Sequence, residues 1–222
     1  TAAQVKQIVQ EVVYREQANK RQTMTLNAYL ALYQEQAEQG VRKTQKGTNF
    51  SPGTIKSIRL ARHQFEVFQV KSGRVYDFND IDYGFRTMFL SYLYGDKKYN
   101  VNTAAKCINT LVTILGAAEA EGYHNNTKCL SRQFRAKRKD VDNVYLTKEE
   151  LQAMMSADIS HLTKLHELAR DIFMVGVYTA QRVSDYNNIA PENIVTGPDG
   201  EAIIRLRQKK TGTLLSIPVK DE

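Results

Sequence analysis

The sequence has 222 residues, with 31 Lys and Arg against 24 Asp and Glu, so its formal net charge is +7. No apolar run approaches the roughly 18 residues that a membrane-spanning helix needs, and the opening residues lack the apolar region of a secretory signal. These features exclude a transmembrane protein, and we expect a cytoplasmic protein whose partners carry negative charge.

The first 140 residues carry helical patterns and no strand pattern. Apolar side chains recur at helical spacing in residues 3–20, 26–40, 51–68, 79–95 and 102–122. Ser51 and Pro52 mark one helix start, because Ser suits the N-cap and Pro the first helical position. Asn79 or Asp80 is expected to cap the next helix, and Asn102 to open the last. This part is therefore predicted to be a compact bundle of about four or five helices.

Beyond residue 140, helical segments are followed by short strands. Thr147 and Glu150 form a capping-box pattern, and residues 161–178 are predicted to form a buried helix. Alternating apolar residues predict three strands, at 194–195, 202–206 and 214–218, with a turn at 209–212 between the last two. The predicted fold class is therefore mainly α, with a helical bundle followed by a partial α+β unit that has a small antiparallel sheet.

The positive charge is concentrated in the first part. Residues 1–140 contain 22 basic and 12 acidic side chains, a net charge of +10, whereas residues 141–222 have a net charge of −3. The densest run, residues 132–139, is called the basic strap below. Its cations are Arg132, Arg135, Lys137, Arg138 and Lys139. The strap is predicted to be either a solvated linker or a segment that binds phosphates.

The cysteines and histidines give no metal-binding pattern. Cys107 and Cys129 are far apart in the sequence and are expected to be small buried residues in a reducing compartment. Among the four scattered histidines, His161 and His166 are five residues apart, which places them on different sides of a helix. We therefore expect no metal site.

Three motifs follow one another in the second part. An apolar helix ends in the box from Thr179 to Asp185 (TAQRVSD), a basic turn has Lys210 before Thr211, and the last strand ends in Ile217-Pro218. In this order they resemble the first half of the catalytic domain of tyrosine recombinases, the phage integrase family. Residues 144–151 are similar to the usual start of that domain.

The helical part fits the same resemblance. Residues 50–65 and 101–123 are similar to helices of the family's SAM-like core-binding domain, and the overall style resembles integrases of Bacteroides-type mobile elements. The resemblance implies a DNA-binding domain over residues 1–140, with 132–143 as a basic linker. Residues 144–222 would then be the N-terminal half of a truncated catalytic domain.

The resemblance implies roles for three residues of the second part. A guanidinium binds two phosphate oxygens at once, and Arg182 would stabilise the charge that develops on an attacked phosphodiester, with Asp185 in support. Lys210, or else Lys209, would protonate the leaving 5′-oxygen. The alternatives are a surface pair of Arg182 with Asp185 and a solvated hairpin lysine. The family prefers glycine at position 180, where Ala180 would be strained if its φ is positive.

The family's tyrosine nucleophile and its His-x-x-Arg motif follow the hairpin lysine. The last histidine of this chain is His166 and the last tyrosine is Tyr186, so no residue matches either feature. Tyr178 and Tyr186, which flank the box, are expected to pack in a core. We therefore expect these 222 residues to bind DNA without cleaving it alone.

The resemblance also implies partners. The parent protein would break and rejoin DNA through a 3′-phosphotyrosyl intermediate, to integrate or excise a mobile element, as a tetramer of protomers on double-stranded DNA and without a cofactor. The alternative is a non-catalytic helical DNA-binding regulator. Besides the five strap cations, the candidate DNA-binding residues are Thr54, Lys56, Arg59, Asn102, Thr103, Lys106 and Lys209.

Overall fold

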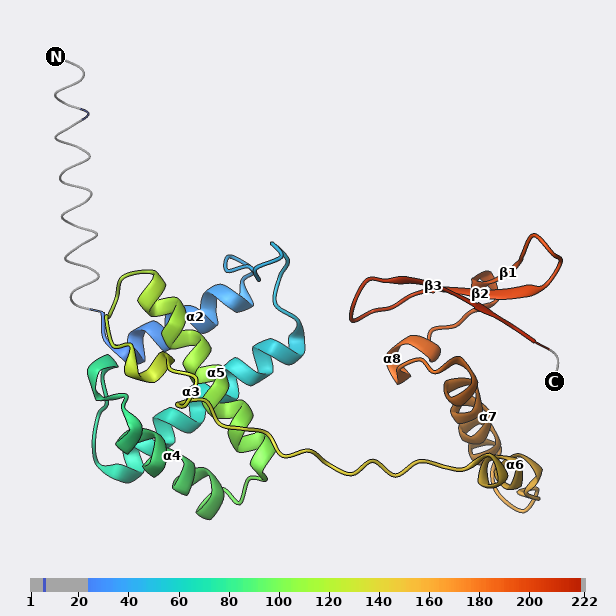
Figure 1. Cartoon of the computed structure of the whole chain (residues 1–222), viewed down its shortest axis with the longest axis horizontal. Helices are drawn as coiled ribbons and strands as arrows, with labels where there is room; N and C mark the ends of the chain where they lie inside the picture. Colours follow the sequence, from blue (N-terminus) through green and yellow to red (C-terminus); the bar gives the residue numbers. More distant parts are fainter. Residues whose placement is uncertain (1–5, 7–23, 221–222) are drawn as a thin grey trace. The chain divides into compact units, whose positions relative to one another are not determined.

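The computed structural model in Figure 1 describes residue 6 and residues 24–220. The helix predicted for residues 3–20 lies outside the described residues, apart from residue 6. The chain divides into two compact units, Thr1–Val141 (unit 1) and Asp142–Glu222 (unit 2), and each is described by itself.

The described part of unit 1 is built from four α-helices. They are α2 (Leu26–Glu38), α3 (Pro52–Ser72), α4 (Tyr83–Gly95) and α5 (Val101–Ala120). The residue before each helix accepts a hydrogen bond through its side chain from the backbone N–H three positions on, and these residues are Thr25, Ser51, Asp82 and Asn100. The predicted helix start at Ser51 and Pro52 is confirmed.

The helix α4 begins later than predicted. Asn79 and Asp80 belong to a separate 3₁₀ turn, η1 (Phe78–Asp80), and α4 begins at Tyr83. The side chain of Asp82 accepts the hydrogen bond that starts α4, so neither Asn79 nor Asp80 is its cap. Several capping residues follow one another here, and local propensity alone does not decide which of them starts the helix.

The helix α5 begins slightly earlier than predicted. It starts at Val101, one residue before Asn102, because the side chain of Asn100 accepts a hydrogen bond from the Thr103 N–H at 2.8 Å. This cap leaves the side chain of Asn102 free to make a different contact, which is described below.

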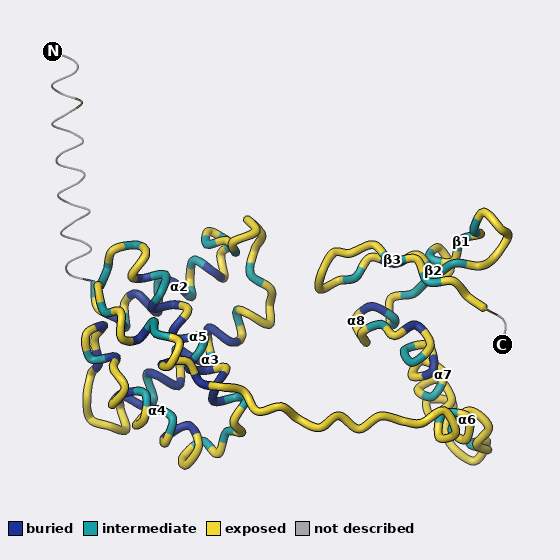
Figure 2. Tube along the Cα trace, in the orientation of Figure 1, coloured by how far each residue is buried: buried dark blue, intermediate teal, exposed yellow. Residues whose placement is uncertain are grey.

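The core of unit 1 is strongly aromatic. Tyr29, Phe65, Phe85 and Phe89 are fully buried, and the rings of Phe85 and Phe89 are stacked with centroids 5.4 Å apart. The buried stretches fall on the facing sides of the four helices (Figure 2). Cys107 and Cys129 are buried with free thiols, which confirms their predicted burial.

The described part of unit 2 has three helices, a 3₁₀ turn and a three-stranded sheet. The helices are α6 (Lys148–Ser156), α7 (Lys164–Thr179) and α8 (Val183–Tyr186), and the turn is η3 (Pro191–Asn193). The strands are β1 (Ile194–Thr196), β2 (Ala202–Arg207) and β3 (Leu214–Pro218). The sheet is antiparallel in the order β1-β2-β3, and Ile204 of β2 pairs with both Ile194 and Ile217.

The predicted fold class is confirmed, since the described chain is mainly helical with one small antiparallel sheet. The capping box before α6 is also confirmed, because Thr147 and Glu150 exchange hydrogen bonds between their side chains and backbone N–H groups. No helix in the described residues is long and apolar enough to cross a membrane.

The prediction that residues 161–178 form a buried helix is wrong in two respects. The helix α7 begins only at Lys164, and most of its apolar side chains are exposed, with Leu165 at 70%. Tyr178, predicted to pack in a core, is 64% exposed, whereas Tyr186 is half-buried. Hydrophobic periodicity identifies an apolar helix face, but it does not specify a partner that covers the face.

Candidate nucleic-acid interface

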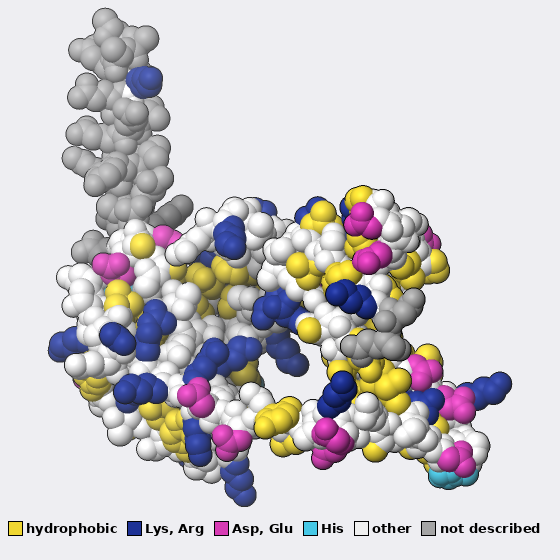
Figure 3. All heavy atoms as spheres, turned by 45° about the vertical axis from the view of Figure 1, so that its right-hand side comes forward, with side chains coloured by type: hydrophobic (Ala, Val, Ile, Leu, Met, Phe, Trp, Pro, Cys, Tyr) yellow, Lys and Arg dark blue, Asp and Glu magenta, His cyan; other side chains and the backbone are white. Residues whose placement is uncertain are grey.

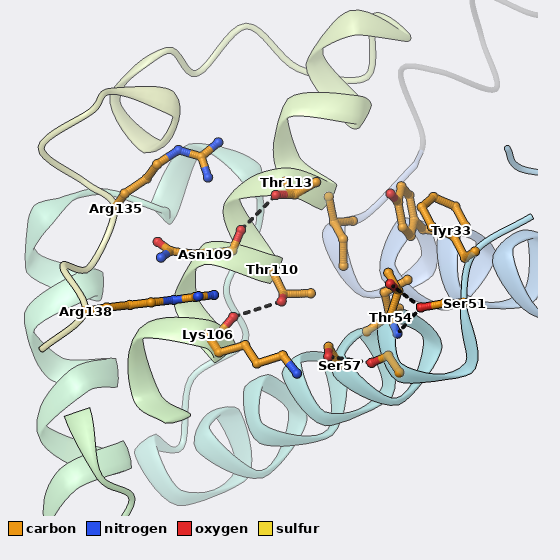
Figure 4. A pocket seen from close by; sticks show the side chains of 14 residues that line it. Tyr33, Ser51, Thr54, Ser57, Lys106, Asn109, Thr110, Thr113, Arg135 and Arg138 are labelled. Carbon is orange, nitrogen blue, oxygen red and sulfur yellow. Dashed lines mark hydrogen bonds between the residues drawn. The ribbon is translucent and has the colours of Figure 1, made fainter. Parts of the chain in front are cut away.

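A groove on unit 1 gathers polar and basic side chains (Figure 4). It lies between the first turns of α3, the middle of α5 and the basic strap, and its volume is about 430 Å³. It is lined by Tyr33, Phe50, Ser51, Gly53, Thr54, Ser57, Ile58, Lys106, Asn109, Thr110, Thr113, Ile114, Arg135 and Arg138.

The charge of this groove has one sign. Lys106 of α5 and Arg135 and Arg138 of the strap line it, and none of its lining residues, all of them described, is acidic. Figure 4 shows Arg138 extending from the strap toward α5, with the side chain of Asn109 between the two arginines. On the face drawn in Figure 3, Lys and Arg side chains are spread over the surface of unit 1. The groove therefore favours anions through local positive charge.

The start of α3 adds to this potential. The Ser51 side chain accepts a hydrogen bond from the Thr54 N–H at 3.2 Å, and the two hydroxyl groups lie 3.0 Å apart. The first turn of a helix carries partial positive charge from backbone N–H groups that lack partners within the helix. A 21-residue helix that presents this end beside three cations suits a phosphate group.

The strap is packed against the rest of unit 1. Phe134 is fully buried and Ala136 is nearly so, and the backbone oxygen of Phe134 accepts a hydrogen bond from Arg86 Nε at 2.7 Å. Arg135, between these two residues, is exposed. Alternate burial of this kind places the apolar side chains inward and the intervening cation outward, as on a β-strand.

The groove brings together four of the predicted DNA-binding residues, Thr54, Lys106, Arg135 and Arg138. The others in unit 1 do not line it: Lys56, Arg59, Asn102, Thr103, Arg132, Lys137 and Lys139. Arg59 Nε instead lies 2.7 Å from Glu38 Oε1, in a surface ion pair. Lys209 belongs to unit 2.

The sequence analysis missed Asn109, Thr110 and Thr113, which line the groove on the same side of α5 as Lys106. The Thr110 and Thr113 hydroxyls donate to the carbonyls of Lys106 and Asn109, one turn earlier. Polar residues at steps of three and four from Lys106 share one helix face, and this spacing was the available signal.

In unit 2, the box from Thr179 to Asp185 forms the turn between α7 and α8. Ala180 ends α7 with φ 51° and ψ 28°, in the left-handed region, so the condition for strain at this position is met. Arg182 follows as the N-cap residue of α8, and 47% of its side chain is exposed. The guanidinium is therefore open to a ligand from outside.

Asp185 connects the box with the basic hairpin. Its side chain is fully buried, and its Oδ1 accepts a hydrogen bond from the Lys209 N–H at 2.9 Å. Its Oδ2 has no hydrogen-bond partner and lies 3.7 Å from Arg182 Nη1. The amide groups of Gln208 and Gln181 add a second link of 2.9 Å between hairpin and box. The fold thus brings Arg182, Asp185 and the hairpin turn together, and Lys209 and Lys210 are exposed on that turn.

Within the described residues, no group of three or more His, Cys, Asp or Glu side chains is placed to hold a metal ion.

Comparison with known proteins finds a family and a solved structure that are similar to this chain. The model of the phage integrase SAM-like domain family matches residues 25–134. The crystal structure of a lambda integrase tetramer bound to a Holliday junction is similar with a TM-score of 0.62 and 22% sequence identity, over 92% of this chain and 52% of that chain. The present chain thus spans about half the length of that integrase. No curated protein matches.

Proposed function

Because the model of the phage integrase SAM-like domain family matches residues 25–134, we propose that the chain belongs to that family and is the DNA-binding part of a site-specific tyrosine recombinase. The observation that carries this proposal is the groove of unit 1, in which Lys106, Arg135 and Arg138 converge with the start of α3. Each cation that contacts a DNA phosphate releases condensed counterions, which provides affinity independent of base sequence.

The hydroxyl groups at the start of α3 add shorter-range contacts. Ser51 and Thr54 offer hydroxyl groups beside the cations, and such groups donate hydrogen bonds to phosphate oxygens, whereas the hydroxyls of Thr110 and Thr113 already donate to carbonyls of α5. Because most of these contacts are directed to phosphates, they fix the position of a duplex on unit 1 without selecting its sequence. This groove is therefore proposed as the non-specific part of the interface.

Unit 2 is proposed to supply part of the reaction site of the whole protein. Arg182 would bind the attacked phosphate, because about half of its side chain is exposed, and Asp185 would hold box and hairpin together. Lys210, or Lys209, would protonate the leaving oxygen from the exposed turn. The reaction would break and rejoin DNA through a 3′-phosphotyrosyl link, without a cofactor.

The tyrosine nucleophile and the His-x-x-Arg motif have no counterparts among these 222 residues, so we propose that they bind duplex DNA without cleaving it. The lambda integrase structure contains a tetramer on a Holliday junction. By analogy, the whole protein is proposed to recombine DNA as a tetramer. The alternative of a regulator without chemistry is not favoured, because the likeness to an integrase covers 92% of the chain and so includes unit 2.

Duplex binding by the 222-residue chain tests the proposal. Fluorescence anisotropy with a labelled duplex of about 30 base pairs, between 50 and 200 mM salt, should give an affinity that falls steeply and linearly on a log–log plot. The same DNA should remain uncut during prolonged incubation. An affinity below detection at 50 mM salt would refute DNA binding, and cut DNA would refute the proposed inactivity of the chain.

A further inference from the structure

The basic strap is held on α5 by the side chains of two asparagines. Asn109 Nδ2 donates to the carbonyl oxygen of Ala136 at 3.0 Å, and its Oδ1 accepts from the N–H of the same residue at 3.1 Å. Asn102 makes the same pair of hydrogen bonds with Lys139, at 3.0 Å and 2.9 Å. Each primary amide thus pairs with the backbone of one strap residue.

The spacing of the two pairs matches the geometry of the two segments. Asn102 and Asn109 are seven residues apart, which is about two helical turns and about 10.5 Å along α5. Ala136 and Lys139 are three residues apart, and an extended chain covers about 10 Å in three residues. The strap therefore runs antiparallel to α5 in one register, and a slip by one residue breaks both pairs at once.

This register determines where the strap cations lie. Arg135 directly precedes the residue held by Asn109, and Arg138 directly precedes the residue held by Asn102. Both arginines line the groove with Lys106, which lies on α5 between the two asparagines. The buried Phe134 side chain anchors the strap just before Arg135. Without the two amide pairs, the segment after Phe134 retains its charges but loses its fixed path.

We propose that Asn102 and Asn109 are positioning residues that fix the register of the basic strap on α5, so that Arg135 and Arg138 meet the phosphates of a bound duplex. Asn102, expected from the sequence to contact DNA, then acts through the strap backbone. The structural half of this inference, that the asparagines hold the strap on α5, concerns the chain without DNA. The functional half, that the held arginines meet DNA phosphates, rests on the proposed DNA binding. A strap that is already ordered loses less conformational entropy when DNA binds than a mobile strap would lose. This smaller entropy cost is the contribution of the two asparagines to the affinity for DNA.

Limited trypsin digestion tests the structural half on the whole 222-residue chain without DNA. Trypsin cleaves after Arg135 and Arg138, and the N–H groups of these two peptide bonds are the ones that the asparagines hold. In Asn102→Ala and Asn109→Ala, cleavage in the strap should accelerate roughly tenfold, because cleavage follows the population of the open segment. Cleavage after Lys46, in the exposed loop at 40–50, serves as the internal reference.

Thr110→Ala is the matched control. Thr110 lies on the same face of α5, but its hydroxyl bonds to the helix's own Lys106 carbonyl, so its loss leaves the strap in place. Digestion of this variant should equal that of the wild-type chain. Asn102 is at the exposed end of the contact and its loss leaves the core of unit 1 intact, so Asn102→Ala tests the idea even if Asn109→Ala does not fold. Wild-type protection in Asn102→Ala would overturn the proposal.

Anisotropy titrations test the functional half. The Asn102→Ala variant should bind a duplex roughly fivefold to tenfold more weakly at one salt concentration, while its log–log salt slope stays that of the wild-type chain, because every cation is retained. Faster digestion with unchanged DNA affinity would refute the role of the register in binding. If the wild-type chain binds no DNA, the proposed function fails, while the digestion result still decides whether the asparagines hold the strap.

Discussion

Neutralising the groove should change the salt dependence of DNA binding by a calculable amount. In the triple variant Lys106→Gln, Arg135→Gln and Arg138→Gln, three cations are removed and a polar, uncharged side chain remains at each position. If each contacts one phosphate, the log–log slope falls by about 0.9 per cation, or about 2.7 in total. Between 50 and 200 mM salt, the wild-type affinity should therefore drop roughly fortyfold more than that of the variant.

A second triple variant controls for net charge. Arg62, Lys71 and Arg74 form surface ion pairs with Glu66, Asp96 and Asp80, respectively, and do not line the groove. Replacing these three cations with Gln changes the net charge by the same amount. Exposed ion pairs contribute little to stability, so the control should remain folded, which circular dichroism checks.

The two variants should differ clearly in the anisotropy titrations. The log–log slope of the groove variant should fall by about 2.7, while the control variant should keep the wild-type slope within about one unit. An equal loss in both variants would mean that the groove is not the place of contact and that binding depends on total charge alone. A wild-type slope in the groove variant would refute the phosphate contacts of these three residues directly.

Three further predictions concern single residues. Ala180→Gly should relieve up to about 1 kcal/mol of left-handed strain and slow amide hydrogen exchange in the last turn of α7 severalfold; unchanged exchange would show that the alanine is unstrained. Asp185→Ala should remove the acceptor for the Lys209 N–H and speed amide exchange in residues 207–213, whereas Asp185→Asn, which keeps an oxygen at this place, should preserve most of the protection. Burial raises the pKa of the Cys107 thiol to about 12, so a thiol reagent at pH 8 should label this residue only as fast as unit 1 opens; immediate labelling of the folded chain would contradict its burial.

Local signals in the sequence were sufficient for most elements of the fold. Ser51 and Pro52 specify the start of α3 through cap and ring geometry that involves only neighbouring residues. The start of α4 was misplaced because Asn79, Asp80 and Asp82 all suit a cap, and the choice among them depends on how the chain packs. Elements with a single strong local signal were therefore predictable, and elements with competing signals were not.

The contacts that build the candidate site were less accessible to sequence reasoning. The strap was recognised by its charge, but its docking on α5 depends on side-chain amides 27 and 37 residues away along the chain. The box around Arg182 was found from its motif, whereas its link to the hairpin passes through the Lys209 backbone, 24 residues from Asp185. Backbone groups are the same at every position, so no residue pattern marks such a contact.

The position of the Tyr186 ring restricts which sequences this fold tolerates. A Cβ atom at Gly176, in the last turn of α7, would lie 2.5 Å from Cε1 of that ring. Glycine inside a helix costs about 0.5–1 kcal/mol relative to alanine, so its presence here is explained by the space that the ring occupies. Positions 176 and 186 should therefore vary together among related sequences, with a side chain at 176 only where 186 is small.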